Sequence, residues 1–341
     1  MVFFVLSGVV LSLAPLTNAG YSWLRYFPRR VLRLGVPTIV ATLLSVLVAV
    51  VVANTVGRAS GTYADFRLPS ADPSNLAHWL YAVISQFDFI FNASDGVAVV
   101  GGTPSNRIDY PVWSMTWEFF FSLILPLVIV IAVAIKRIRT DWLICALVTI
   151  CVFISFLSGY FPLRFIVVFL FGVVIAKHFG AIRAKRRGIA TVTLLTVAAV
   201  ALIELPALLA HFGGKLGQQP VIVAAGNTLM CLGAALLVLA AAIPGWLSSF
   251  LSWRPVDYLG RISFSLYLTH SLCISAVRMF AGRLGTGFSA VPMALAVGIS
   301  LAFAIAFYCA VEKPSIHLAK HASMRLTAGF AAHGGFTRAG K

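Results

Sequence analysis

A single carboxylate, Glu118, interrupts a long apolar stretch and is the first candidate for chemistry. Ser114 and Ser122 stand four residues before and after it, so on a helix the three side chains share one face. An ionised group inside a membrane segment costs about 2.5–3.5 kcal/mol on insertion scales, so it needs a partner or a function. Two roles fit Glu118: a catalytic acid, or a structural partner of an arginine or backbone group that fixes helix packing.

A second polar stripe ends at His270. Ser263, Tyr267 and His270 are spaced i, i+4, i+7 and share one face of a helix predicted over residues 262–280. This spacing fits a hydrogen-bonded seam between helices and equally a contact to substrate. We predict that His270 and Glu118 are catalytic. The predicted substrate-binding residues are Trp113, Ser114 and Tyr267.

Three arginines, Arg29, Arg30 and Arg33, directly precede a helix predicted over residues 34–53. Arg30 and Arg33 are spaced i, i+3, so their two guanidinium groups can point the same way at one anion. They fit a contact to lipid phosphates that anchors a cytoplasmic loop, or a binding site for a cytoplasmic polyphosphate such as coenzyme A. We predict that all three bind such a polyphosphate.

No metal site, bound cofactor or nucleic-acid module is expected. His317 and His321 are spaced i, i+4, but they lie in a basic tail without a third ligand, which favours a solvated or membrane-surface helix. The five cysteines form no CxxC pair and lie within or beside apolar stretches, so they are interpreted as small buried hydrophobic residues.

The composition determines the kind of protein that must position these residues. Hydrophobic residues make up 60% of the chain and charged residues only 11%, less than half the charged share of an ordinary globular protein. This balance excludes a soluble enzyme, a disordered chain and a disulfide scaffold. The apolar stretches are close to 20 residues long, which matches a bilayer core about 30 Å thick. The sequence therefore predicts an all-α fold, a polytopic bundle of transmembrane helices.

Nine membrane spans are predicted. They lie at about 1–14, 34–53, 113–135, 142–158, 163–177, 189–207, 221–243, 262–280 and 292–311.

Basic loops alternate with loops poor in lysine and arginine, and basic loops stay in the cytoplasm. Residues 25–33 and 183–187 are therefore predicted to lie inside and residues 54–112 outside. Residues 76–91 are predicted to form a helix that lies at the outer interface or folds back onto the bundle. This places the arginine cluster and Glu118 in opposite halves of the membrane. Residues 1–314 are predicted to form one helical domain and residues 315–341 a basic cytoplasmic tail.

Five segments together resemble the membrane acyltransferase 3 family, whose members move acyl groups onto sugars of surface polysaccharides and related acceptors. The resemblance covers the chain from Phe3 to Pro314. The segments are FFVLSGVVL at 3–11, FPRRVLRLGVP at 27–37, VWSMTWEFFFSLILP at 112–126, LGRISFSLYLTH at 259–270 and VEKP at 311–314.

The resemblance implies a bundle of about ten helices that takes acyl-coenzyme A from the cytoplasm and presents the acceptor hydroxyl on the outer side. Arg30 and Arg33 match the family's RxxR, Glu118 matches the acid of its WSxxxE segment, and Tyr267 and His270 match the end of its SLYLxH segment. The expected partners are acyl-coenzyme A, commonly acetyl-coenzyme A, a carbohydrate or lipid-linked sugar acceptor, and membrane lipids. The expected location is the bacterial inner membrane, with the C-terminus in the cytoplasm.

The family's catalytic histidine belongs to a first helix that lies ahead of the FFVLSG stretch, in an Arg-x10-His pattern. This sequence begins at that stretch, and its earliest histidine, His78, does not match the position. The predicted span at 1–14 must run from the outside inward to reach the basic loop at 25–33, and this requires an earlier helix that runs outward. We therefore expect an N-terminal helix to be missing from the sequence. Three interpretations follow: an integral-membrane O-acyltransferase, a truncated inactive homologue, and a transporter or flippase without covalent chemistry.

Overall fold

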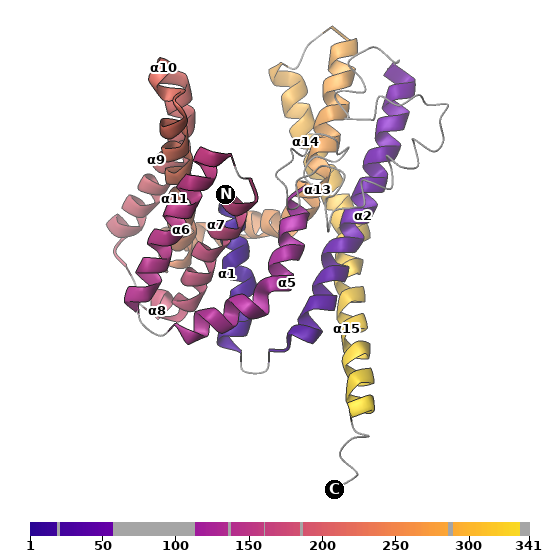
Figure 1. The fold of residues 1–341 in the computed structure, drawn as a ribbon. Coiled ribbons are helices and arrows are strands. Elements are labelled where there is room, and N and C mark those ends of the chain that lie inside the picture. Colours follow the sequence, from indigo (N-terminus) through magenta and orange to yellow (C-terminus); the bar gives the residue numbers. More distant parts are fainter. Residues whose placement is uncertain are drawn as a thin grey trace. The chain divides into compact units, whose positions relative to one another are not determined.

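The computed structural model describes residues 1–18, 21–56, 113–135, 138–159, 161–184, 187–285 and 289–334 (Figure 1). Within these ranges every regular element is a helix and no strand forms, which confirms the predicted all-α class. The helices group into two compact units. Unit 1 takes in Met1–Tyr21 and Phe121–Asp257, and unit 2 takes in the described residues of Ser22–Ala98, Gly102–Phe120 and Tyr258–Lys341.

Unit 1 is built mainly from apolar helices of 16 to 24 residues joined by short ones. Its elements are α1 (Val2–Thr17), the second part of α5 (Trp113–Ala134), α6 (Ile138–Ser158), α7 (Phe161–Lys177), α8 (Phe179–Ala184), α9 (Ile189–Phe212), α10 (Gly214–Gly217), α11 (Pro220–Ala242) and α12 (Trp246–Leu251). Helices α9 and α11 lie side by side, with α10 in the turn between them (Figure 1).

Helices α1 and α7 cross at two glycines. A Cβ atom on Gly8 would lie 2.2 Å from the carbonyl oxygen of Phe169, and one on Gly172 would lie 2.0 Å from that of Val5. Only glycine permits such a close approach of two backbones, the packing that small residues give to membrane helices. The crossing fixes α1 firmly within unit 1.

Unit 2 surrounds a core to which four of its helical elements contribute. Its elements are α2 (Trp23–Val56), the start of α5, most of α13 (Arg254–Arg283), α14 (Ala290–Phe307), the π-helical turn η3 (Tyr308–Glu312) and α15 (Lys313–Gly334). Leu34, Met115, Leu268 and Phe307 meet in the core. Helix α15 continues past residue 314 and packs along α2 (Figure 1). The predicted boundary between a helical domain and a basic tail at residues 314/315 stays a prediction.

Six helical stretches in the described ranges are long and apolar enough to cross a membrane. They lie in α5, α6, α9, α11, α13 and the continuous α14–η3–α15 helix. The predicted count of nine spans is not confirmed: α1 and α7, with 16 and 17 residues, are shorter than the spans counted, and α2 is not among them. Large apolar side chains such as Leu194, 70% exposed, cover the outer faces, as expected for contact with lipid.

Helix α2 departs from the sequence-based expectation at its start. Residues 25–33 were predicted as a cytoplasmic loop, yet they lie within α2, which begins at Trp23 and runs for 34 residues. A span predicted from hydropathy ends where charged residues begin. The helix itself can continue through them, because arginine is a good helix former. The arginines therefore project from a rigid helix.

Candidate active site

The predicted acid and one predicted donor arginine form an ion pair within unit 2. Nη2 of Arg30, on α2, donates to Oε2 of Glu118, on α5, and their side chains are only 14% and 5% exposed. The buried Nε of Arg30 has no hydrogen-bond partner among the described residues. A buried N–H of this kind remains available to an oxygen of a ligand or a water molecule.

This ion pair corrects the predicted separation of the two residues across the membrane. Arg30 and Glu118 are 88 positions apart in the chain, but contact requires that they lie at the same level of the bundle. The expectation that they occupy opposite halves is wrong, because it assigned Arg30 to a loop outside the membrane. Arg30 and Glu118 therefore belong to one site.

A hydrogen bond joins the next part of the site to α13. The hydroxyls of Ser114 and Tyr267 lie 2.6 Å apart, and Ser114 is buried. Ser114 precedes Glu118 by one helical turn of α5, so both side chains lie on the same face, as predicted. Two predicted substrate-binding residues are therefore brought together beside the ion pair.

His270, on α13, has one ring nitrogen fixed by its own helix. Nδ1 lies 3.1 Å from the carbonyl oxygen of Leu266 and 2.9 Å from that of Tyr267. A carbonyl oxygen only accepts, so Nδ1 carries the proton, and in the neutral ring Nε2 keeps its lone pair. His270 is thus in the tautomer that suits a general base acting through Nε2.

The predicted face of α13 borders a groove of about 410 Å³. Ser263, Tyr267 and His270 all line it, as their spacing predicts, and the remaining wall is mostly apolar, formed by side chains of α13 and α14. The apolar residues are Leu266, Ile274, Val297 and Leu301. The groove can hold a small apolar group next to the imidazole of His270.

A second buried carboxylate in unit 2, Glu312, was not recognised from the sequence. It ends the π-helical turn η3 and is 3% exposed, and Ser265 of α13 donates to its Oε2 over 2.5 Å. The positive charge of Arg33 also acts on it. Single π-helical turns are frequent at functional sites. The available signal was an acid directly after an apolar stretch, in the VEKP segment.

The remaining predicted residues are exposed or lie partly or wholly outside the described residues. The side chain of Arg29 is exposed on α2, and Trp113 is the first residue of α5, with a side chain outside the described part. Residues 76–91 and the rest of 57–112 also lie outside the described residues. His317 and His321 are exposed on α15, and the described ranges contain no group of three or more potential metal ligands.

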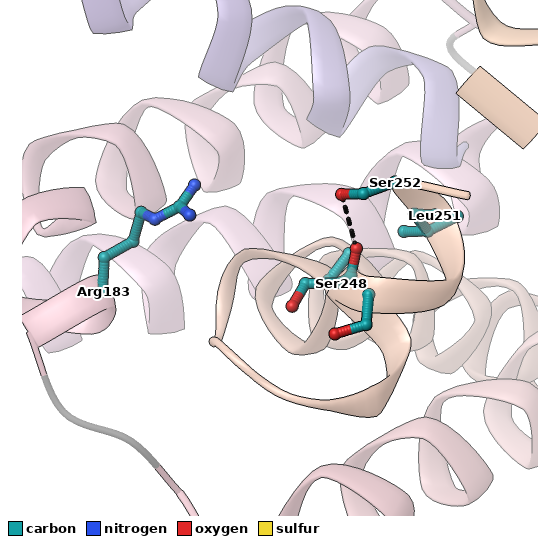
Figure 2. Close-up of a pocket in the computed structure, with 6 residues that line it drawn as sticks. Arg183, Ser248, Leu251 and Ser252 are labelled. Atoms are coloured by element: carbon teal, nitrogen blue, oxygen red, sulfur yellow. Dashed lines mark hydrogen bonds between the residues drawn. The ribbon is translucent and has the colours of Figure 1, made fainter. Parts of the chain in front are cut away.

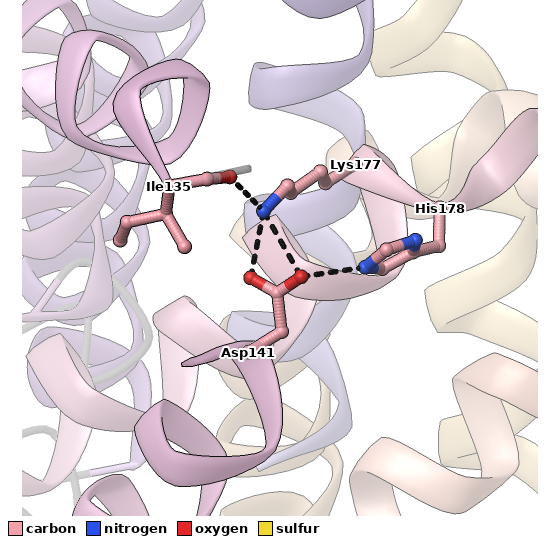
Figure 3. Close-up of polar contacts among 4 residues, drawn as sticks. All are labelled: Ile135, Asp141, Lys177 and His178. Atoms are coloured by element: carbon pink, nitrogen blue, oxygen red, sulfur yellow. Dashed lines mark hydrogen bonds and ion pairs between the residues drawn. The ribbon is translucent and has the colours of Figure 1, made fainter. Parts of the chain in front are cut away.

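Unit 1 has a polar cluster of its own, also missed by the sequence-based interpretation (Figure 3). Nζ of Lys177 lies 2.7 and 2.9 Å from the two carboxylate oxygens of Asp141 and 2.6 Å from the carbonyl oxygen of Ile135. Nε2 of His178 lies 2.9 Å from Oδ2 of Asp141. The cluster joins the ends of α5, α6 and α7.

Comparison with known families adds the decisive observation. A family model described as an acyltransferase domain, that of acyltransferase 3, matches residues 1–311. The chain belongs to the membrane acyltransferase 3 family. This confirms the sequence resemblance, and the match contains every candidate site residue from Arg29 to His270. No curated protein and no solved structure matches the chain significantly.

The family and the apolar helices together indicate that this membrane acyltransferase is an integral membrane protein. An acyltransferase must hold an acyl donor, activate an acceptor and stabilise the charge that develops on the carbonyl oxygen. Unit 2 offers a groove, an imidazole and an arginine for these three tasks.

Proposed function

We propose that the protein is an integral-membrane O-acyltransferase that moves an acyl group, commonly acetyl, from acyl-coenzyme A to a hydroxyl of a surface carbohydrate or a lipid-linked sugar. The observation that carries this proposal is a continuous row of polar side chains that ends at the groove. Arg30 pairs with Glu118, Ser114 bonds to Tyr267, and His270 lines the groove. Each member is either bonded to the next or one helical turn from it. Membership of the acyltransferase family supplies the reaction type.

The arginines of α2 are proposed to hold the donor's phosphates. Arg30 is paired with Glu118, and the charge of Arg33 acts on the buried Glu312. Arg29 and Arg33 are exposed and can contact a polyphosphate. Arg30 is held by Glu118, and its buried Nε–H is proposed to donate to the reacting group.

His270 is proposed as the general base. Nε2 takes the proton of the acceptor hydroxyl, whose oxygen attacks the thioester carbonyl carbon. As the carbon–sulfur bond breaks, the coenzyme A thiolate leaves and receives the proton from the imidazolium. Arg30 stabilises the transient oxyanion, and Glu118 keeps the guanidinium in place. The products are the O-acylated acceptor and free coenzyme A.

The proposed location is the bacterial inner membrane, with the donor entering from the cytoplasm and the C-terminus on that side. Support comes from the concentration of basic residues near residues 183–187 and in the C-terminal segment, which favours retention in the cytoplasm. The proposed acceptor lies on the opposite side, reached through the bundle.

The test is an acyl-transfer assay on membranes that contain the full chain, supplied with acetyl-labelled acetyl-coenzyme A. The expected result is release of coenzyme A thiol together with alkali-labile label in carbohydrate. His270→Gln should lower turnover by about 100-fold. His178→Gln, which changes the histidine of unit 1, is the matched control and should keep turnover. Movement of substrate across the membrane without release of coenzyme A would instead establish a transporter.

A further inference from the structure

A polar pocket of about 500 Å³ lies in unit 1 (Figure 2), and none of its described lining residues belongs to the proposed active site. Its wall combines Arg183 of α8 with Ser248 and Ser249 of α12 and with Ser252, which follows α12. Ala241 and Leu251 complete the described lining, none of which is acidic. The pocket therefore brings one fixed positive charge to the same space as three hydroxyl groups.

The guanidinium of Arg183 is exposed, and its Cζ atom lies 5.7 Å from the ring centre of Phe179. This contact with an aromatic face restricts the side chain while its N–H groups stay available. A planar guanidinium with several donors matches the oxygens of a phosphate group. Arg183 thus provides the main element of an anion site.

The serine hydroxyls of the pocket make local hydrogen bonds. Ser248 donates to the carbonyl oxygen of Gly245 over 2.9 Å and accepts from the N–H of Gly245 over 3.0 Å. Ser249 donates to the carbonyl oxygen of Gly245 over 3.0 Å, and Ser252 donates to that of Ser248 over 2.8 Å (Figure 2). These carbonyls belong to a short helix at an exposed chain turn, where water can replace a hydroxyl donor. The hydroxyls of Ser249 and Ser252 can therefore rotate to donate to an oxygen of a bound anion, while Ser248 remains part of the helix cap.

The surroundings indicate a membrane interface. Helices α8 and α12 are six-residue helices that follow the apolar helices α7 and α11. Trp246, Phe250 and Trp253 are 41%, 51% and 60% exposed on or next to α12. Exposed tryptophans near the ends of spans are typical of the level of the lipid headgroups.

We propose that the Arg183 pocket binds the phosphate group of an anionic phospholipid headgroup. Arg183 contacts the phosphate oxygens, the serines of α12 complete the site, and the exposed aromatic residues lie against the lipid beside it. Basic pockets between membrane helices commonly take such headgroups. The proposal is independent of the acyl-transfer reaction, because no residue of the proposed active site takes part.

Binding can be measured on the purified full chain by titration with phosphatidylglycerol and, separately, with phosphatidylcholine, using native mass spectrometry to count bound lipids. The wild-type chain should retain phosphatidylglycerol in preference to phosphatidylcholine. Arg183→Gln should weaken phosphatidylglycerol binding by about tenfold, and Arg183→Lys by about threefold, since lysine keeps the charge but loses the planar fork. Thermal unfolding of each variant checks that it is folded.

Arg187→Gln is the matched control, because Arg187 is exposed four residues away and does not line the pocket. It should leave phosphatidylglycerol binding unchanged. Equal losses in the Arg183 and Arg187 variants would overturn the proposal in favour of a diffuse basic surface. A third titration uses inorganic phosphate; binding of inorganic phosphate without binding of phosphatidylglycerol would overturn the lipid assignment.

Discussion

Units 1 and 2 each bury a carboxylate beside cationic side chains, but they do so at different positions along their helices. Asp141 of unit 1 lies in the first turn of α6, and its partner Lys177 is the last residue of α7. Glu118 of unit 2 lies inside α5, and its partner Arg30 lies well inside α2. The same chemistry is thus placed at helix ends in one unit and within helices in the other.

At helix ends, charged groups have a structural explanation. An acid at the start of a helix and a base at the end of another both interact favourably with the helix dipoles. Lys177 also satisfies the carbonyl of Ile135, which follows the last turn of α5. The cluster of unit 1 therefore stabilises the junction of three helices, and no further role is needed to account for it.

Within a helix, the backbone groups are already paired and the dipole effect has faded. A buried ion pair there is costly to desolvate, and well-packed apolar residues often serve stability equally well. Arg30 and Glu118 thus have no equivalent structural explanation. The difference between the units supports a functional role for the residues of unit 2 and a structural role for those of unit 1.

The largest expected effect comes from Glu118→Gln. The substitution leaves the buried charge of Arg30 without its carboxylate, so we expect a loss of about 3 kcal/mol in the free energy of unfolding. We also expect turnover to fall by about 100-fold or more, since Arg30 is no longer held at the reacting group. Thermal unfolding in detergent and the thiol-release assay measure the two effects separately.

A double variant, Arg30→Gln with Glu118→Gln, separates packing from chemistry. With both charges removed, much of the lost stability should return, because no charge remains unpaired. Turnover should stay low. Recovery of turnover in the double variant would show that the ion pair only fixes helix packing and would erase the distinction between the two units.

Asp141→Asn should have an intermediate effect on stability and, unlike Glu118→Gln, no effect on turnover. Lys177 and His178 lose their shared carboxylate, and we expect unfolding to become easier by about 2 kcal/mol. Turnover per folded molecule should not change, because no residue of the proposed active site belongs to the cluster. A large fall in the turnover of folded protein would contradict the structural assignment of unit 1.

The sequence predicted those parts of the site that lie on a single helix. Ser263, Tyr267 and His270 share a face because helical periodicity fixes their relative positions, and the structure confirms that all three line one groove. Ser114 and Glu118 follow the same rule on α5. Local spacing is sufficient for such relations, since the backbone bonds of a helix determine them.

Contacts between helices could not be predicted in the same way. The partner of Glu118 lies 88 residues away, and hydropathy assigned it to a loop because arginines end an apolar stretch. Glu312 depends on a π-helical turn, whose extra residue changes the direction of the side chains that follow. Lys177 and His178 reach Asp141 only through the packing of α6 against α7. These relations are properties of tertiary structure.

The smallest expected effect tests whether the hydrogen bond between Ser114 and Tyr267 belongs to the active site. Tyr267→Phe removes one hydroxyl, so we expect a loss of about 1 kcal/mol in the free energy of unfolding. Thr193→Val, which removes the acceptor of the exposed 3.1 Å bond from Trp246 Nε1 in unit 1, is the control for loss of one hydrogen bond between side chains. If Tyr267 contacts substrate, its variant alone should also raise KM or lower kcat by about fivefold, because a polar group of the substrate loses its partner. Equal behaviour of the two variants in the acyl-transfer assay would assign the bond to helix packing and limit the functional part of unit 2 to Arg30, Glu118 and His270.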